Sequence, residues 1–238
     1  MSEFITDVNE HISLIQDKNG LTYGTDAFLL ASFIKGKKNG HAIEIGSGSG
    51  IISLLLAKKG KFEKITALEV QEYFASLTKR NIENNGLSSV ITAVHTDCRE
   101  YSAQADAVFM NPPYMKTESG KRNGDDGKYI ARHEVCGDIY ELCLSASRLL
   151  KYGSDLYVVY RPDRLTDLIC AMRQSKIEPK NLCFVFQTQK HQPCLALVQG
   201  KLGGKSGMTV MRPLFLADED GKSTPDCDYI YENCKWYQ

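Results

Sequence analysis

The sequence predicts an α/β fold: a doubly wound, mostly parallel sheet that ends in a C-terminal antiparallel hairpin. Apolar runs of strand length alternate with amphipathic stretches of helix length, which is the pattern of a parallel sheet covered by helices. The last two apolar runs follow each other without a helix between them. The 238 residues suit one compact domain, and a hydrophobic content of 42% is normal for a globular chain.

The first half of the chain is expected to alternate helices and strands. An apolar stretch begins at Ala27, and Thr25 or Asp26 before it is a suitable helix N-cap. A later helical period stops near Asn85-Gly86, which is a C-cap signal. The expected elements are a helix over 27–34, a strand over 41–45, a helix over 49–58, a strand over 64–70 and a helix over 71–84.

The second half continues this alternation before the hairpin. Tyr152-Gly153 is expected to close one helix, and Pro162 to open the next. Residues 115–136 are polar and contain glycine, which predicts a long loop over the rim of the sheet, whereas 201–238 are turn-rich without a period. The expected elements are strands over 90–95, 105–110 and 155–160, helices over 138–150 and 163–175, and hairpin strands over 182–187 and 194–199.

Composition narrows the possible functions. Lys and Arg number 29, as do Asp and Glu, and this balance argues against a long-range electrostatic binder of nucleic acid while allowing a local basic patch. No apolar run approaches the roughly 18 residues of a membrane helix, and the start lacks a secretory signal pattern. We therefore expect a cytoplasmic protein without a membrane partner, and a monomer by default. The eight cysteines lack metal-ligand spacing, which predicts reduced thiols and no metal site.

A glycine loop follows the strand expected at 41–45. It reads Glu44-Ile-Gly46-Ser-Gly48-Ser-Gly50, and glycines there permit a positive φ and a close approach of the backbone to a ligand. A dinucleotide fingerprint would need Gly or Ala at position 51, which is Ile51. Glu69 ends the next strand, where a carboxylate can accept both hydrogen bonds of a ribose diol. The alternative is a glycine-rich turn beside acids that cap helices.

The loop resembles that of class I S-adenosylmethionine-dependent methyltransferases, which has the form E-x-G-x-G-x-G. The resemblance implies a Rossmann-like methyltransferase domain over 41–200, a segment over 1–40 that closes over the cofactor, and an extension over 201–238 packed on the same domain. It also implies that an acid after the third strand bonds the adenine amine and that Glu44 helps to hold the ammonium group. The residues expected to bind S-adenosylmethionine are Glu44, Gly46, Gly48, Gly50, Glu69, Asp97 and Asp26.

The tetrapeptide Asn111-Pro112-Pro113-Tyr114 follows the strand expected at 105–110. Two prolines stiffen the turn. The side-chain carbonyl of Asn111 offers one acceptor and its backbone carbonyl or that of Pro112 offers another, which suit an –NH2 group with two hydrogens. Hydrogen bonds to both hydrogens favour a lone pair that is localised on the nitrogen, where it would otherwise be delocalised into the π system. Tyr114 can stack on a flat substrate. The motif resembles that of methyltransferases acting on adenine N6, guanine N2 or glutamine N5. Alternatively, Asn-Pro simply ends a strand.

Three other segments resemble the bacterial family of tRNA1(Val) adenine-37 N6-methyltransferases. They cover residues 24–31, 131–134 and 160–165, and the likeness extends from about residue 10 to residue 215. The resemblance implies a tRNA partner and methylation of adenine N6 in an anticodon loop. We expect Lys121, Arg132 and His133, in the predicted loop, to bind the RNA, because that loop carries an excess of basic residues.

Other functions fit the same motifs. A protein glutamine-N5 methyltransferase would share the tetrapeptide, but such enzymes usually carry an N-terminal helical domain, and only about 40 residues precede the first expected strand of this sheet. An rRNA guanine-N2 methyltransferase is a further alternative. A non-catalytic RNA-binding module of the same fold is the alternative from another class, and the intact tetrapeptide argues against it.

Overall fold

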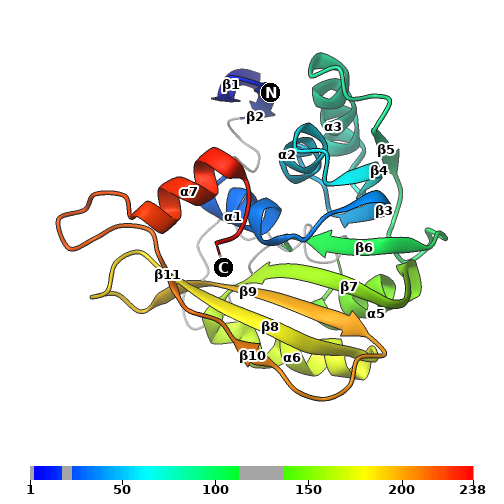
Figure 1. Cartoon of the computed structure of the whole chain (residues 1–238). Coiled ribbons are helices and arrows are strands. Elements are labelled where there is room, and N and C mark those ends of the chain that lie inside the picture. Colours follow the sequence, from blue (N-terminus) through cyan, green and yellow to red (C-terminus); the bar gives the residue numbers. More distant parts are fainter. Residues whose placement is uncertain (1–2, 18–22, 113–136, 238) are drawn as a thin grey trace, which may run out of the picture.

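A nine-stranded sheet forms the centre of the molecule. The computed structural model describes residues 3–17, 23–112 and 137–237, and in these the strand order is β10-β8-β9-β7-β6-β3-β4-β5, with β11 also paired to β8 (Figure 1). The strands are β3 (Lys37–Ile45), β4 (Phe62–Glu69), β5 (Ile91–His95), β6 (Ala105–Met110), β7 (Leu150–Tyr160), β8 (Ile177–Phe186), β9 (Pro193–Leu202), β10 (Thr209–Val210) and β11 (Leu214–Phe215).

The sheet is parallel from β5 to β7, whereas β9 pairs antiparallel with both β7 and β8. The predicted fold class, a mostly parallel sheet with a C-terminal antiparallel hairpin, is therefore confirmed. The strand order reverses direction around β3, because the chain moves from β3 to β4 and β5 on one side and then to β6 and β7 on the other. Ligands of open α/β sheets bind at the carboxyl ends of the strands near such a reversal.

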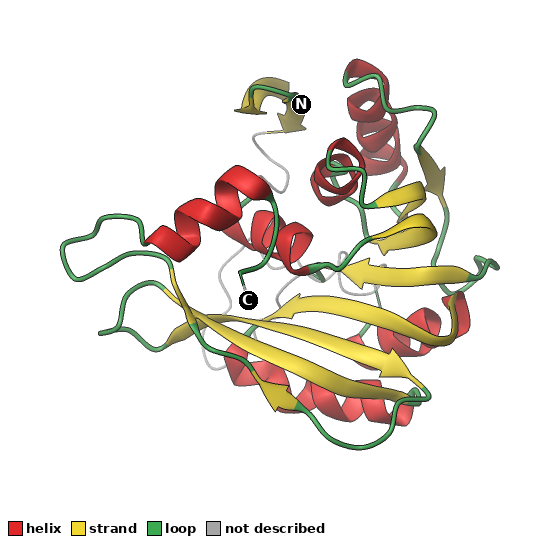
Figure 2. Cartoon of the chain, viewed as in Figure 1, coloured by secondary structure: helices red, strands yellow, loops and turns green. Residues whose placement is uncertain are grey.

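Helices cover both faces of the sheet (Figure 2). Each layer buries its own apolar cluster, with Leu29 and Leu55 fully or almost fully buried in one and Cys143 and Leu168 in the other. Among the described helices, none is both long and apolar enough to span a membrane. One face carries α1 (Thr25–Phe33), α2 (Ile51–Lys58), α3 (Glu72–Asn84) and α7 (Pro225–Asn233), and the other α5 (Ile139–Leu149) and α6 (Leu165–Gln174), which follows a 3-10 turn at Pro162–Arg164.

Two local expectations were wrong. Strand β7 begins at Leu150, directly after α5, so Tyr152-Gly153 lies within a strand and does not close a helix. Gly153 has a φ of 80°, and the pairing of β7 with β6 shifts register in this stretch. Both features are typical of a β-bulge, which interrupts the pairing without ending the strand. The N-cap of α1 is Gly24, and neither Thr25 nor Asp26 caps the helix, because both already lie inside its first turn.

An N-terminal hairpin, which the sequence reasoning did not include, lies against α3. Its strands are β1 (Glu3–Asn9) and β2 (Ile12–Asp17). The Asn81 side chain accepts from the Ile15 N–H at 2.7 Å and donates to the Ile15 carbonyl at 3.0 Å, as a partner strand would. Asn85 makes the same pair of bonds to Ser13. The two amides therefore fix the hairpin on the helix that follows β4.

The C-terminal residues pack against α1. Helix α7 is capped by Thr224, whose side chain accepts from the Cys227 N–H at 3.2 Å. Its Tyr231 ring stacks on Phe28 of α1 with centroids 4.6 Å apart. Cys234 is buried beside Ser32 of the same helix. The tail that lacked a sequence period thus covers the first helix of the fold.

Candidate active site

The glycine loop joins β3 to α2 at the carboxyl edge of the sheet. Gly46, Gly48 and Gly50 have φ values of 74°, 57° and 80°, all in the left-handed region that favours glycine. A Cβ atom on Gly46 or Gly48 would meet no atom within 4 Å, whereas one on Gly50 would lie 3.0 Å from Thr78. The first two glycines therefore expose backbone on an open side, which a ligand can approach closely.

Hydrogen bonds with backbone groups and with side chains hold the glycine loop in place. The N–H groups of Gly46 and Ser47 both donate to the Leu68 carbonyl of β4, at 2.9 and 3.0 Å. The Thr78 hydroxyl donates to the Gly48 carbonyl at 2.9 Å, and the Asn81 amide donates to the Ser49 carbonyl at 2.9 Å. Thus α3 fixes both the loop and the N-terminal hairpin.

Glu69 lies at the end of β4 directly beside this loop. Its Oε2 accepts from the Gly48 N–H at 2.9 Å and its Oε1 from the Gln71 N–H at 3.0 Å. The side chain is buried, and burial raises the pKa of Glu69 while the backbone donors lower it. Each carboxylate oxygen has a second lone pair. Glu69 is therefore placed to accept further bonds, as the ribose prediction requires.

Glu44 is the least accessible of the acids predicted to bind the cofactor. It is 1% exposed, and its carboxylate accepts a short hydrogen bond from the Ser53 hydroxyl of α2. Burial raises the pKa of Glu44 to about 8, and the nearby Glu69 charge adds to this increase. In this structure Glu44 ties β3 to α2, and its contact with a cofactor ammonium stays a prediction.

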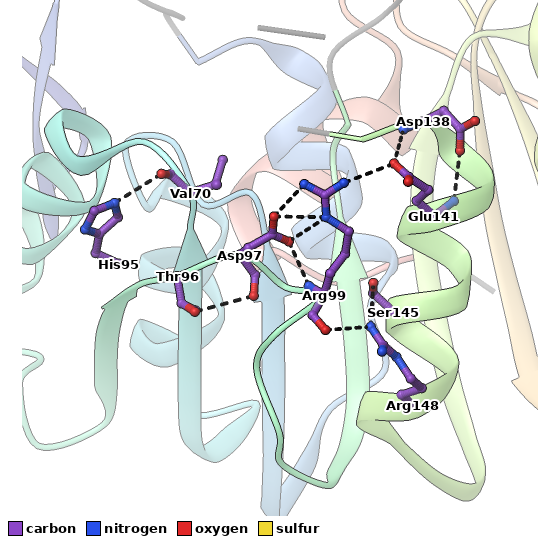
Figure 3. Close-up of polar contacts among 9 residues, drawn as sticks. All are labelled: Val70, His95, Thr96, Asp97, Arg99, Asp138, Glu141, Ser145 and Arg148. Carbon is purple, nitrogen blue, oxygen red and sulfur yellow. Dashed lines mark hydrogen bonds and ion pairs between the residues drawn. The ribbon is translucent and has the colours of Figure 1, made fainter. Parts of the chain in front are cut away.

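Asp97 follows β5 and is paired with a residue that the sequence analysis did not single out. Arg99 donates to both Asp97 carboxylate oxygens, with its Nη2 2.6 Å from Oδ2, and reaches Glu141 at 3.4 Å (Figure 3). The hydrogen bond from Arg99 lowers the pKa of Asp97 below its usual range. An Asp-x-Arg spacing in a turn is the signal that could have revealed this pair.

Asn111 lies at the end of β6, next to the glycine loop. In the β3–β6 register, Met110 pairs with Ile45, so Asn111 and Gly46 leave neighbouring strands at the same level. The Asn111 Nδ2 donates to Asp26 Oδ2 at 2.9 Å. Asp26, which the sequence analysis grouped with the cofactor residues, is thus joined to the tetrapeptide. Pro112 is buried beside it.

Several predicted site residues lie outside the described part of the chain. These are Tyr114 of the tetrapeptide, with Pro113 before it, and the expected RNA-binding residues Lys121, Arg132 and His133. Their roles stay predictions. The described site therefore consists of the glycine loop, three acids at strand ends, and the Asp26–Asn111 pair.

Comparisons with known proteins bear on the fold of the chain. A family model described as a methyltransferase small domain matches residues 18–126, which include the glycine loop, Asp26 and Asn111. A solved structure from Agrobacterium tumefaciens, described as a predicted O-methyltransferase, has a TM-score of 0.73 over 90% of this chain and 98% of its own, at 20% identity. The chain therefore has the fold of class I methyltransferases, and residues 18–126 match the methyltransferase small domain.

Curated relatives of the chain carry a more specific description. A protein of Dyadobacter fermentans is 27% identical over 62% of this chain and 62% of its own length, and one of Tolumonas auensis is 26% identical over 89% and 88%. Both are described as tRNA1(Val) (adenine(37)-N6)-methyltransferases. A structure of TYW2 from Pyrococcus horikoshii in complex with MeSAdo is similar at a TM-score of 0.60, with 15% identity over 85% of this chain and 72% of its own.

Proposed function

We propose that this protein is an S-adenosylmethionine-dependent tRNA methyltransferase that methylates the exocyclic N6 of an adenine, in the anticodon loop of a valine tRNA. The observation that carries the proposal is the position of Asn111 beside the glycine loop, with its carboxamide held at the end of β6. The descriptions of the relatives from Dyadobacter and Tolumonas support the choice of tRNA and of adenine N6.

The residues present fit the cofactor at two of three points. The backbone around Gly46 and Gly48 is open to a ligand, and Glu69 offers a buried carboxylate of the kind that binds a ribose diol. Asp97 is shared with Arg99, so a bond to an adenine amine would have to compete with, or add to, that ion pair. When bound, S-adenosylmethionine supplies an electrophilic methyl group.

The chain's own task is then to position a weak nucleophile. An exocyclic adenine nitrogen delocalises its lone pair into the ring, and hydrogen bonds to its two hydrogens favour a tetrahedral nitrogen. Asn111 and the backbone carbonyl of Pro112 are the acceptors proposed for these bonds. Positioning and preorganised dipoles at such a point are large contributors to catalysis. An adenine in a structured loop must leave its stack to reach them.

Labelled S-adenosylmethionine distinguishes this function from its alternatives. The protein is incubated with total tRNA, rRNA or release factor from a strain that lacks the enzyme, and the products are digested to nucleosides or peptides. We expect label in N6-methyladenosine from the tRNA. Label only in a glutamine-containing peptide or in N2-methylguanosine would refute the proposal in favour of those functions, and no label with any substrate would favour a non-catalytic module.

A further inference from the structure

Asp26 and Asn111 are joined although 85 positions separate them in the sequence. The bond runs from Asn111 Nδ2 to Asp26 Oδ2 and is 2.9 Å long. Asp26 lies in the first turn of α1, whereas Asn111 follows β6. This contact connects the first helix of the fold to the residue proposed to face the substrate amine.

The chemistry of the contact selects one orientation of the Asn111 amide. An ionised carboxylate can only accept hydrogen bonds, so it attracts the NH2 group of a carboxamide and repels its oxygen. With Nδ2 turned toward Asp26, the carbonyl oxygen occupies the other branch of the planar amide. That oxygen is the acceptor that a substrate amine requires. The opposite orientation would present two donors to the amine, which itself donates.

Asp26 is itself held in place. Its second oxygen, Oδ1, accepts from the Ala27 N–H at 2.9 Å, so the carboxylate spans the start of α1 and the Asn111 side chain. An acid in the first turn of a helix is also favoured by the helix dipole. Residues 27–33 of this helix are buried, and its Phe28 stacks on Tyr231 of α7. The Asp26 carboxylate is therefore held by a helix that is itself packed into the core.

We propose that Asp26 is a positioning residue that holds the Asn111 carboxamide with its oxygen toward the acceptor amine, and that it acts through Asn111 and not by binding the cofactor. The inference rests on the proposed function, because the orientation of the Asn111 amide affects methyl transfer only when the acceptor is an amine. It assigns to α1 a role in transfer of the methyl group that is separate from any role in covering the cofactor.

The kinetic test uses the full chain with Asp26→Ala and Asp26→Asn, alone and combined with Asn111→Ala. We expect Asp26→Ala to lower kcat about tenfold or more, because a charge-assisted bond that orients the amide is lost, while the Kd for S-adenosylmethionine changes less than about twofold. Asp26→Asn is expected to lower kcat less, since its oxygen can still accept. In the Asn111→Ala background, loss of the Asp26 carboxylate should have no further effect on kcat.

A second readout is independent of activity. In spectra of the 15N-labelled protein, the Asn111 side-chain NH2 signals should shift in Asp26→Ala, because the charged acceptor is removed. They should not shift in Asp228→Ala, the matched control, which removes an exposed acid from the first turn of α7. Thermal unfolding of each variant verifies that it is folded.

Each result bears on one of the two proposals. A wild-type protein that labels no substrate refutes the proposed function, and the Asn111 signals still show whether Asp26 orients the amide. Unchanged Asn111 signals in Asp26→Ala overturn the positioning role. So does a raised Kd with kcat unchanged, which would make Asp26 a cofactor contact, or an equal loss of kcat with and without Asn111.

Discussion

The ends of β4 and β6 lie at the same edge of the sheet but are held in different ways. At β4, Glu69 accepts from two backbone N–H groups, and the N–H groups of Gly46 and Ser47 donate to the Leu68 carbonyl, so these contacts are made to the main chain. At β6, Asn111 is bonded to the side chain of Asp26 from a distant helix. In the proposed function, binding of the cofactor and orientation of the acceptor therefore depend on separate groups, and substitutions at the two strand ends should have separate effects.

The largest expected effect falls on the β6 side. Asn111→Ala is predicted to lower kcat by roughly 10²-fold or more, the scale of losing one preorganised polar contact, without weakening cofactor binding. Methylation assays under saturating cofactor, together with calorimetric titration of S-adenosylmethionine, measure the two quantities. Near-normal turnover would contradict the role proposed for Asn111 and the division of roles between the ends of β4 and β6.

Glu69→Gln tests the β4 side. The substitution keeps the size of the side chain but replaces one carboxylate oxygen with a donor, which opposes the N–H of Gly48 or Gln71 and weakens acceptance from a ribose diol. We expect the Kd for S-adenosylmethionine to rise about tenfold or more, since bonds to charged groups contribute about 1.5–3 kcal/mol. A drop in kcat at saturating cofactor with an unchanged Kd would contradict the division between the two strand ends.

Glu44→Gln tests whether the buried acid beneath the loop titrates. The folded-state pKa of about 8 exceeds the ordinary 4.5, so between these pH values the folded protein holds a proton that the unfolded chain has released. The contribution of Glu44 to the free energy of unfolding is therefore fully present below pH 4.5. It is lost as the pH rises toward 8, at up to about 1.4 kcal/mol per pH unit.

The measurement is the melting temperature as a function of pH. Wild type should lose up to about 3–6 °C per pH unit relative to Glu44→Gln across that window, because a neutral amide cannot ionise. Parallel curves for the two proteins would show that Glu44 is charged throughout.

The smallest effect is expected at β5. Arg99→Ala breaks the ion pair with Asp97, in which both side chains are partly exposed, and such pairs contribute about 0–1 kcal/mol. The Kd for S-adenosylmethionine should therefore change by less than about fivefold, in contrast to Glu69→Gln. A change of a hundredfold in the same titration would make Arg99 a cofactor residue in its own right.

The alternation of strands and helices along the chain, and the common edge of the sheet for the site residues, could be predicted from the sequence. Glu69, Asp97 and Asn111 each follow an apolar run, and the carboxyl ends of parallel strands meet at one edge. The environment of each acid could not be predicted in this way. Glu69 and Asp97 occupy equivalent strand ends, yet burial raises the pKa of one and Arg99 lowers that of the other.

Contacts between distant segments were also beyond sequence reasoning. The resemblance groups Asp26 with the cofactor residues because in the related families its segment closes over the cofactor, and only the packing of α1 brings it to Asn111. The N-terminal hairpin was missed although Ile12 and Leu14 alternate with less buried residues, because its strand partner and its docking on Asn81 depend on tertiary structure. Helix α7 gave no clear period, since few of its residues face the core.

Titration of S-adenosylmethionine into wild type, Glu69→Gln and Asn111→Ala tests the central claim most directly. The account predicts saturable one-to-one binding to wild type, the same Kd within about twofold for Asn111→Ala, and weaker binding for Glu69→Gln by about tenfold or more. An absence of saturable binding to wild type, or equal weakening by both substitutions, would contradict it.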